Sequence, residues 1–183
     1  MKPSFQEAKA TQTATMLLSL SGGEMNYMKL IKEMYLIDRE ALLRWGRPVS
    51  YDSYFSLRHG PILSNTLDLI NEGVRPLAES EWVDHISAPT NYSVSLKKEC
   101  PPDDLSEAEE ELIQEIFKQF RCMNEWQLVD YLHENLPEWK DPSGSAIPIN
   151  YHDILVAGGK TVLAASEIES ELEDLALMDG LLG

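Results

Sequence analysis

The segment Gly159-Lys160-Thr161 comes closest to a motif that carries chemistry, because phosphate-binding loops end in Gly-Lys followed by Thr or Ser. Such a loop also needs a glycine five positions before its last glycine, so that the backbone can wrap around the phosphate. Ile154 occupies that position in this chain. We therefore interpret the segment as the end of a helix followed by a solvent-exposed lysine, and not as a nucleotide-binding site.

The histidines are the next candidates for chemistry, either as metal ligands or as acid–base groups. They are His59, His85, His133 and His152, and no two of them have the spacing of a helical metal-binding pair. The chain also lacks a Gly-x-Ser-x-Gly nucleophile elbow and a Cys-x-x-Cys pair. We therefore expect no metal, no cofactor and no catalytic residue. One alternative stays open, a small metal-dependent hydrolase that uses His59, His133 and nearby carboxylates.

Net charge narrows the class of partner. The chain of 183 residues has 31 Asp and Glu against 15 Lys and Arg, which gives a formal charge of −16. Nucleic acid and anionic membrane surfaces repel such a protein, so neither is an expected partner. The acidity is uneven, because residues 1–60 carry a net charge of +2 and residues 61–183 carry −18. The acidic part is therefore expected to meet a protein with a basic surface.

No segment predicts export or membrane insertion. The apolar run from Ala14 to Leu20 follows Glu7 and lacks a small-residue cleavage site, unlike a signal peptide. No run approaches the roughly 18 apolar residues that a membrane span needs. Cys100 and Cys122 lie far apart in the sequence and are expected to be reduced thiols. These features predict a cytoplasmic protein.

Helical periodicity dominates the N-terminal half of the chain, with short alternating segments between the helices. A capping box of Ser21 and Glu24 is expected to open the longest helix, and Gly46 is expected to end it. Gly73 is expected to close the next helix, and residues 88–91 are expected to form a turn. The predicted helices cover residues 13–20, 24–45 and 62–72. Residues 49–59 are predicted to form a short strand or an extended segment, and two further strands are predicted over residues 82–87 and 92–97.

The C-terminal half is expected to be helical. Ser106 and Asn124 are the expected N-caps of two helices, and Ser166 with Glu169 forms the capping box expected to open the last helix. The predicted helices here cover residues 107–120, 125–136, 150–157 and 166–178. The fold class predicted from both halves is α+β, predominantly α-helical, with a small antiparallel β element.

Two blocks of sequence have an order and spacing that is more specific than any single motif. The first contains Leu30-Ile-Lys-Glu-Met-Tyr-Leu-Ile-Asp-Arg-Glu40, Gly46-Arg-Pro48 and Phe55-Ser-Leu-Arg-His-Gly-Pro61. The second contains Leu128-Val-Asp-Tyr-Leu-His133, Pro137-Glu-Trp139 and the segment from Ile149 to Ile154. Together these blocks resemble the SocA-like Panacea domain family of antitoxins.

The resemblance implies a mostly helical, non-enzymatic domain that acts as the antitoxin of a toxin–antitoxin pair. We divide the chain into a flexible arm (1–12), the SocA-like Panacea domain (13–160) and an acidic amphipathic helix and tail (161–183). The residues that match the family motif are Tyr35, Asp38, Arg39, His59, Gly60, Pro61, His133 and Trp139.

The expected function is neutralisation of a cognate protein toxin by direct binding. In the last helix Ile168, Leu172 and Leu175 share an apolar face that is suited to a groove on the toxin. The acidic side chains around them complement a basic surface. Self-association stays open, and the main alternative is a protease adaptor or phage-related interaction protein. Direct DNA binding is not expected, because the chain has no basic recognition helix.

Overall fold

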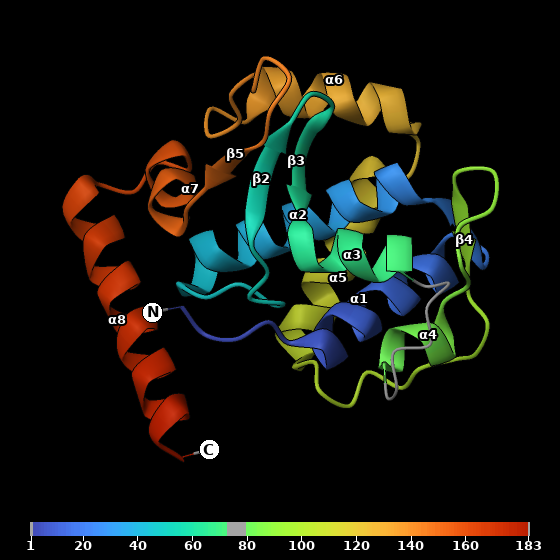
Figure 1. Cartoon of the computed structure of the whole chain (residues 1–183), viewed down its shortest axis with the longest axis horizontal. Coiled ribbons are helices and arrows are strands. Elements are labelled where there is room, and N and C mark those ends of the chain that lie inside the picture. The colour runs from blue at the N-terminus through green and yellow to red at the C-terminus, as the bar shows by residue number, and fades with distance from the viewer. Residues whose placement is uncertain (1, 73–79, 183) are drawn as a thin grey trace.

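Helix α2 (Tyr27–Trp45) lies at the centre of the molecule, and the other elements surround it (Figure 1). The computed structural model describes residues 2–72 and 80–182. Because α2 is covered on most of its sides, even Lys32, Glu33 and Asp38 are buried. Its main neighbours are α1 (Glu7–Leu20), α5 (Glu107–Phe120), α6 (Glu125–Asn135), α7 (Tyr151–Ala157) and the strand β3 (Gly60–Leu63).

Helix α1 begins at Glu7, earlier than the sequence indicated. Ala10 and Gln12 are buried. The Gln12 side chain donates a hydrogen bond to the Asp104 carboxylate at 2.5 Å and accepts one from the Asp104 backbone N–H at 2.9 Å. The flexible arm expected over residues 1–12 is therefore wrong from Glu7 onward, because tertiary contacts order this polar segment.

Ser21 and Glu24 do not open α2, because Glu24 belongs to the strand β1 (Glu24–Asn26), which pairs with β4 (Ser93–Ser95). Asn26 caps α2 instead. Its side-chain oxygen accepts the N–H groups of two residues in the first turn, at 2.9 and 3.2 Å. The expected capping box is therefore wrong, since a paired strand intervenes before the helix.

A three-stranded antiparallel sheet packs beside α2 in the order β3-β2-β5. Its central strand β2 (Tyr54–Leu57) pairs with β3 on one side and with β5 (Ile147–Ile149) on the other. The strand expected over residues 49–59 is therefore confirmed only in its second half. With the β1–β4 pair, the described residues form two small antiparallel sheets in a predominantly helical α+β fold, which confirms the predicted class.

The helix expected from Ile62 begins at Ser64, as α3 (Ser64–Glu72). Ile62 is instead paired with Phe55 in the β2–β3 hairpin. The apolar spacing suits both structures, and pairing with a neighbouring strand decides between them. Gly73, the residue expected to close this helix, lies outside the described residues.

A short helix, α4 (Glu81–His85), replaces the strand expected over residues 82–87. Trp82 is 1% exposed, and α4 packs against α1. Only Ile86 keeps an antiparallel bridge to the neighbouring segment. The prediction was wrong because burial of one tryptophan against a helix outweighs a weak strand pattern. The strand expected over residues 92–97 is confirmed at its centre by β4.

The N-caps expected at Ser106 and Asn124 are confirmed at the starts of α5 and α6, and both residues form capping boxes. The box expected at Ser166 is wrong, because α8 (Val162–Leu182) begins before that residue. Ser166 lies inside the helix, and its hydroxyl donates to the Val162 carbonyl at 2.9 Å. Helix α8 stands at one side of the molecule, where it packs mainly on α7 (Tyr151–Ala157) (Figure 1).

Two buried carboxylates hold the segment that connects α2 to β2. The Asp38 carboxylate accepts the backbone N–H groups of Val49 and Ser50, at 3.1 and 2.9 Å, and the hydroxyl groups of Ser50 and Tyr54. Burial raises the pKa of Asp38 to about 6, and the hydrogen bonds from Ser50 and Tyr54 limit this rise. The carboxylate therefore anchors this loop to the central helix.

Asp52 fixes the start of α3 in a similar way. Its carboxylate is buried and accepts the backbone N–H groups of Asn65 and Thr66 at 2.8 and 2.9 Å. It also accepts the Thr66 hydroxyl at 2.7 Å. This side chain satisfies N–H groups in the first turn of α3 that have no partner within the helix.

Asp52→Ala is expected to lower the free energy of unfolding by about 2 to 4 kcal/mol, because it removes a cap and leaves buried donors unsatisfied. Urea denaturation of the variant and the parent protein measures the loss. Asp68→Ala, at an exposed position of the same helix, is the control and should change stability by less than about 0.5 kcal/mol. Equal losses in both variants would contradict this role of Asp52.

Candidate functional site

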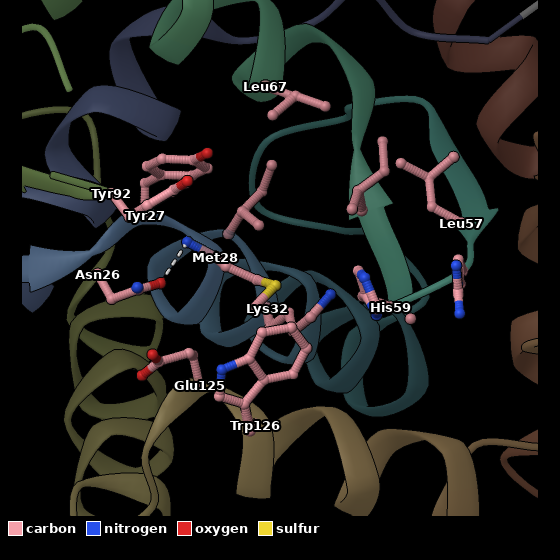
Figure 2. Close-up of a pocket in the computed structure, with 14 residues that line it drawn as sticks. Asn26, Tyr27, Met28, Lys32, Leu57, His59, Leu67, Tyr92, Glu125 and Trp126 are labelled. Carbon is pink, nitrogen blue, oxygen red and sulfur yellow. Dashed lines mark hydrogen bonds between the residues drawn. The ribbon is translucent and has the colours of Figure 1, made fainter. Parts of the chain in front are cut away.

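A pocket of about 690 Å³ lies between α2, the β2–β3 hairpin and the start of α6 (Figure 2). We call it the α2 pocket. Its size and its apolar lining with a few polar groups are typical of ligand sites, which makes it the candidate functional site. The residues that define it in the following argument are Tyr27, Lys32, Leu57, His59, Tyr92 and Trp126.

Aromatic side chains form much of the wall of the α2 pocket. The rings of Tyr27 and Tyr92 are 6.3 Å apart, and the Tyr27 backbone N–H donates to the Tyr92 carbonyl at 2.9 Å. Trp126 meets His59 edge-on at 5.2 Å. Tyr92 and Trp126 are 72% and 52% exposed, so these rings offer apolar area that the protein itself does not cover.

Lys32 is the most unusual residue of the pocket. It is 1% exposed, and its ammonium group donates one long hydrogen bond, 3.5 Å, to the Pro61 carbonyl. In Figure 2 its side chain extends toward the hairpin that carries His59. Burial lowers the pKa of Lys32 to about 7, because water does not solvate its charged form there.

The segment His59-Gly60-Pro61 shapes the pocket around Lys32. Gly60 has φ +104°, a conformation that side chains with a Cβ rarely adopt. A Cβ at this position would also lie 3.2 Å from the Lys32 ammonium nitrogen. Glycine therefore lets the lysine approach the hairpin, while Pro61 supplies its acceptor and His59 lies at the exposed rim. These three consecutive residues of the family motif therefore lie beside Lys32.

The motif residues Tyr35 and Arg39 lie elsewhere on α2 and share one partner, Glu138. Tyr35 donates to the Glu138 carboxylate at 3.0 Å, and the Arg39 guanidinium donates to it at 2.5 and 3.4 Å. The Glu138 side chain is fully buried, and that of Arg39 is 13% exposed. Burial raises the pKa of Tyr35 well above its usual value, so the phenol remains a donor. This cluster is a structural clamp between α2 and the turn after α6.

His133 and Trp139 continue the same clamp. Their rings stack at 3.8 Å, and the Trp139 indole N–H donates to the Leu57 carbonyl at 2.9 Å. Burial, with a smaller contribution from the charge of Lys32, lowers the pKa of His133 below its usual value. These two residues therefore fasten the turn after α6 to β2, next to the pocket but outside its lining.

The three apolar residues expected on one face of the last helix differ in how far they are exposed. Leu172 is 3% exposed and Ile168 packs against the core, whereas Leu175 is 47% exposed. The first two attach α8 to the body of the protein. Only Leu175 remains available to a partner.

Several residues of the site were not identified from the sequence. Lys32 lies between apolar residues of a helical stripe, but nothing in its spacing distinguishes it from a surface lysine. Trp126 and Tyr92 come from segments far apart in the sequence, and the fold alone brings them to the pocket. Glu138 had a usable signal, because it stands between the motif residues Pro137 and Trp139.

Two general expectations concern metals and membranes. Within residues 2–72 and 80–182, no cluster of three or more His, Cys, Asp or Glu side chains has the arrangement of a metal site. In the same part of the chain, no helix has both the length and the apolar character of a membrane span.

The fold and the site define a small helical protein whose motif residues lie on one buried helix and on the segments that pack against it. A family model, described as antitoxin SocA-like, Panacea domain, matches residues 30–140, which is more than half of the chain. The chain therefore belongs to the SocA-like Panacea domain family. No curated protein and no solved structure matches it.

Lys32→Met is expected to raise the free energy of unfolding at pH 7 by about 2 to 4 kcal/mol, because it removes a poorly paired buried charge. Between pH 7 and 10.5 the unfolded chain binds more protons at Lys32 than the folded protein does. Stability of the parent should therefore rise with pH, by about 1 kcal/mol per unit between pH 7 and 9. Urea titrations at several pH values measure this slope.

The Lys32→Met variant should lose most of that slope, whereas Lys118→Met, at an exposed position on α5, should keep it. A slope that is the same in all three proteins would show that Lys32 is not the group responsible.

Glu138→Ala is expected to destabilise the protein by about 3 to 5 kcal/mol, because Arg39 and Tyr35 would lose their shared buried partner. Thermal and urea denaturation measure the effect. Glu134→Ala, an exposed position on α6, controls for the loss of one carboxylate and should change stability by less than about 0.5 kcal/mol. A loss below about 1 kcal/mol for Glu138→Ala would rule out the clamp as a major source of stability.

Proposed function

We propose that this protein is an antitoxin of the cytoplasm that neutralises a cognate protein toxin by binding it directly. The observation that carries the proposal is membership of the antitoxin SocA-like family over residues 30–140. The charge of the chain supports a basic toxin, because a formal charge of −16 attracts a cationic partner over a distance of several ångströms.

The outward face of α8 is the surface that we assign to the toxin. It is defined by the exposed side chains of Glu167, Glu171, Asp174, Leu175, Met178 and Leu181, which lie outside the stripe of Ala165, Leu172 and Ala176 that the protein buries. Leu175, Met178 and Leu181 are 47%, 58% and 86% exposed. Apolar side chains at such spacing, flanked by acidic ones, suit a helix that enters an apolar groove with a basic rim.

Charge is concentrated in the same region. Residues 161–183 contain six Asp and Glu and no Lys or Arg. Exposed acidic groups mainly accelerate association with a basic partner, and added salt weakens this attraction. Apolar anchors mainly slow dissociation. The outward face of α8 carries both kinds of group.

Expression of the protein encoded beside this chain is expected to stop cell growth, and co-expression of this chain is expected to restore it. Purified partners should then form a complex whose association rate falls as salt rises. If the neighbour is toxic and this chain neither restores growth nor binds it, the proposal is wrong. The half-life of the neighbour in cells separates blockade, which leaves it unchanged, from delivery to a protease, which shortens it.

Glu171→Lys with Asp174→Lys is expected to slow association with the toxin by about tenfold at low salt, because it reverses the charge of the outward face of α8. Stopped-flow or surface-based binding kinetics measure the rate. Glu107→Lys with Glu111→Lys, at exposed positions on α5, makes the same change of net charge elsewhere and should slow association less. Equal effects of the two pairs would show that overall charge matters and the outward face does not.

A further inference from the structure

The α2 pocket gathers positive charge in a protein that is strongly acidic overall. The basic side chains of Lys32 and Arg58 line it, against one carboxylate, that of Glu125. The formal charge of the whole chain is −16. The sign of the charged groups in this pocket is therefore opposite to that of the protein that surrounds it.

We propose that the α2 pocket binds a small organic anion, a molecule with an apolar or aromatic body and one acidic group that pairs with Lys32. This inference goes beyond the antitoxin proposal and does not depend on it. The pocket and its ligand class follow from the residues of α2, the hairpin and α6, whereas the toxin surface lies on α8.

The state of Lys32 is the first argument. An ammonium group has three N–H donors, and within the described residues this one makes a single hydrogen bond of 3.5 Å. A charge buried without a close partner is costly, and a carboxylate or similar anion is the group that compensates it best. The pocket provides the space in which such a partner fits, because Lys32 is one of its lining residues.

The rest of the lining determines the body of the ligand. Met28, Ile31, Leu57, Ile62 and Leu67 are apolar and face the same space. A volume of about 690 Å³ lies within the range of pockets for small molecules, which is roughly 300 to 1,000 Å³. A ligand with many charges would leave these side chains without apolar contacts, so one acidic group on an apolar body fits best.

Aromatic rings close the pocket on two sides. Figure 2 shows Tyr27 and Tyr92 on one side, Trp126 on another and His59 opposite the tyrosines. The exposed faces of Tyr92 and Trp126 suit a flat or aliphatic group placed between them. The walls come from segments around residues 27, 60, 92 and 126, so a compact molecule seated in the pocket would contact all four segments.

The test compares two fluorescent probes with nearly the same body, anilinonaphthalene sulfonate, which is anionic, and N-phenylnaphthylamine, which is neutral. The intact protein is expected to bind the anionic probe at least about tenfold more tightly, which corresponds to about 1.4 kcal/mol. Lys32→Met should abolish this preference, and Lys118→Met should keep it. Equal affinities for both probes in the parent, or an unchanged preference in Lys32→Met, would overturn the proposal.

Trp126→Leu provides a second variant that keeps the lysine. The substitution should weaken the binding of both probes by a similar factor and leave the preference for the anion intact. Loss of the preference would contradict the separate roles that we assign to Trp126, as part of the wall, and to Lys32, as the charge. Circular dichroism and cooperative unfolding confirm that each variant is folded before its affinity is compared.

Competition then tests the class of natural ligand. Octanoate and indole acetate, which carry one carboxylate on an apolar body, are expected to displace the anionic probe at lower concentrations than adenosine monophosphate. The reverse order would overturn the apolar body that we assign to the ligand. Failure of every small acid to displace the probe would overturn the small-molecule site in favour of a protein segment.

Discussion

Burial of charged residues on α2 is the constraint on which the rest of the structure depends. A charge on a helix that is covered on most sides is costly unless it finds a partner, because an uncompensated buried charge would cost several kcal/mol. Asp38 takes its partners from the loop before β2, and Arg39 takes Glu138 from the turn after α6. Glu33 has Lys29 at 3.8 Å, and burial raises the pKa of Glu33 to about 7. Loops with little regular structure are thereby held in place by the central helix.

This constraint also explains why the motif residues are dispersed in the sequence and compact in space. Arg39 and Trp139 hold the same turn, one through an ion pair with Glu138 and the other through a hydrogen bond to β2. Gly60, which has no Cβ, leaves room for the buried side chain of Lys32. Most of the motif therefore describes how the polar groups of α2 find hydrogen-bond partners, whereas the ammonium group of Lys32 makes a single long hydrogen bond of 3.5 Å among the described residues. The candidate pocket lies at one of the places where the compensation of a charge on α2 is incomplete; Glu33, whose carboxylate oxygens accept no hydrogen bond from the described residues, is another.

Local signals in the sequence predicted the helices well where capping and periodicity agree, as at Ser106 and Asn124. They failed where a distant segment decides the outcome. The pairing of β1 with β4 placed a strand before α2. Ile62, expected in a helix, instead pairs with a neighbouring strand in the β2–β3 hairpin. Burial of Lys32 could not be predicted for the same reason, since it results from the approach of a hairpin across Gly60. The residues that line the pocket become neighbours only through the tertiary fold.

The region matched by the family model contains much of the α2 pocket but not the proposed toxin surface on α8. Residues 30–140 include Lys32, His59 and Trp126 of the α2 pocket, whereas α8 lies entirely outside them. Helix α8 is attached through a few buried residues, among them Ala165 and Leu172. Its outward face can therefore change with little effect on the core. We expect anion binding by the pocket to be a property of the shared domain, and the outward face of α8 to determine which partner this particular chain binds.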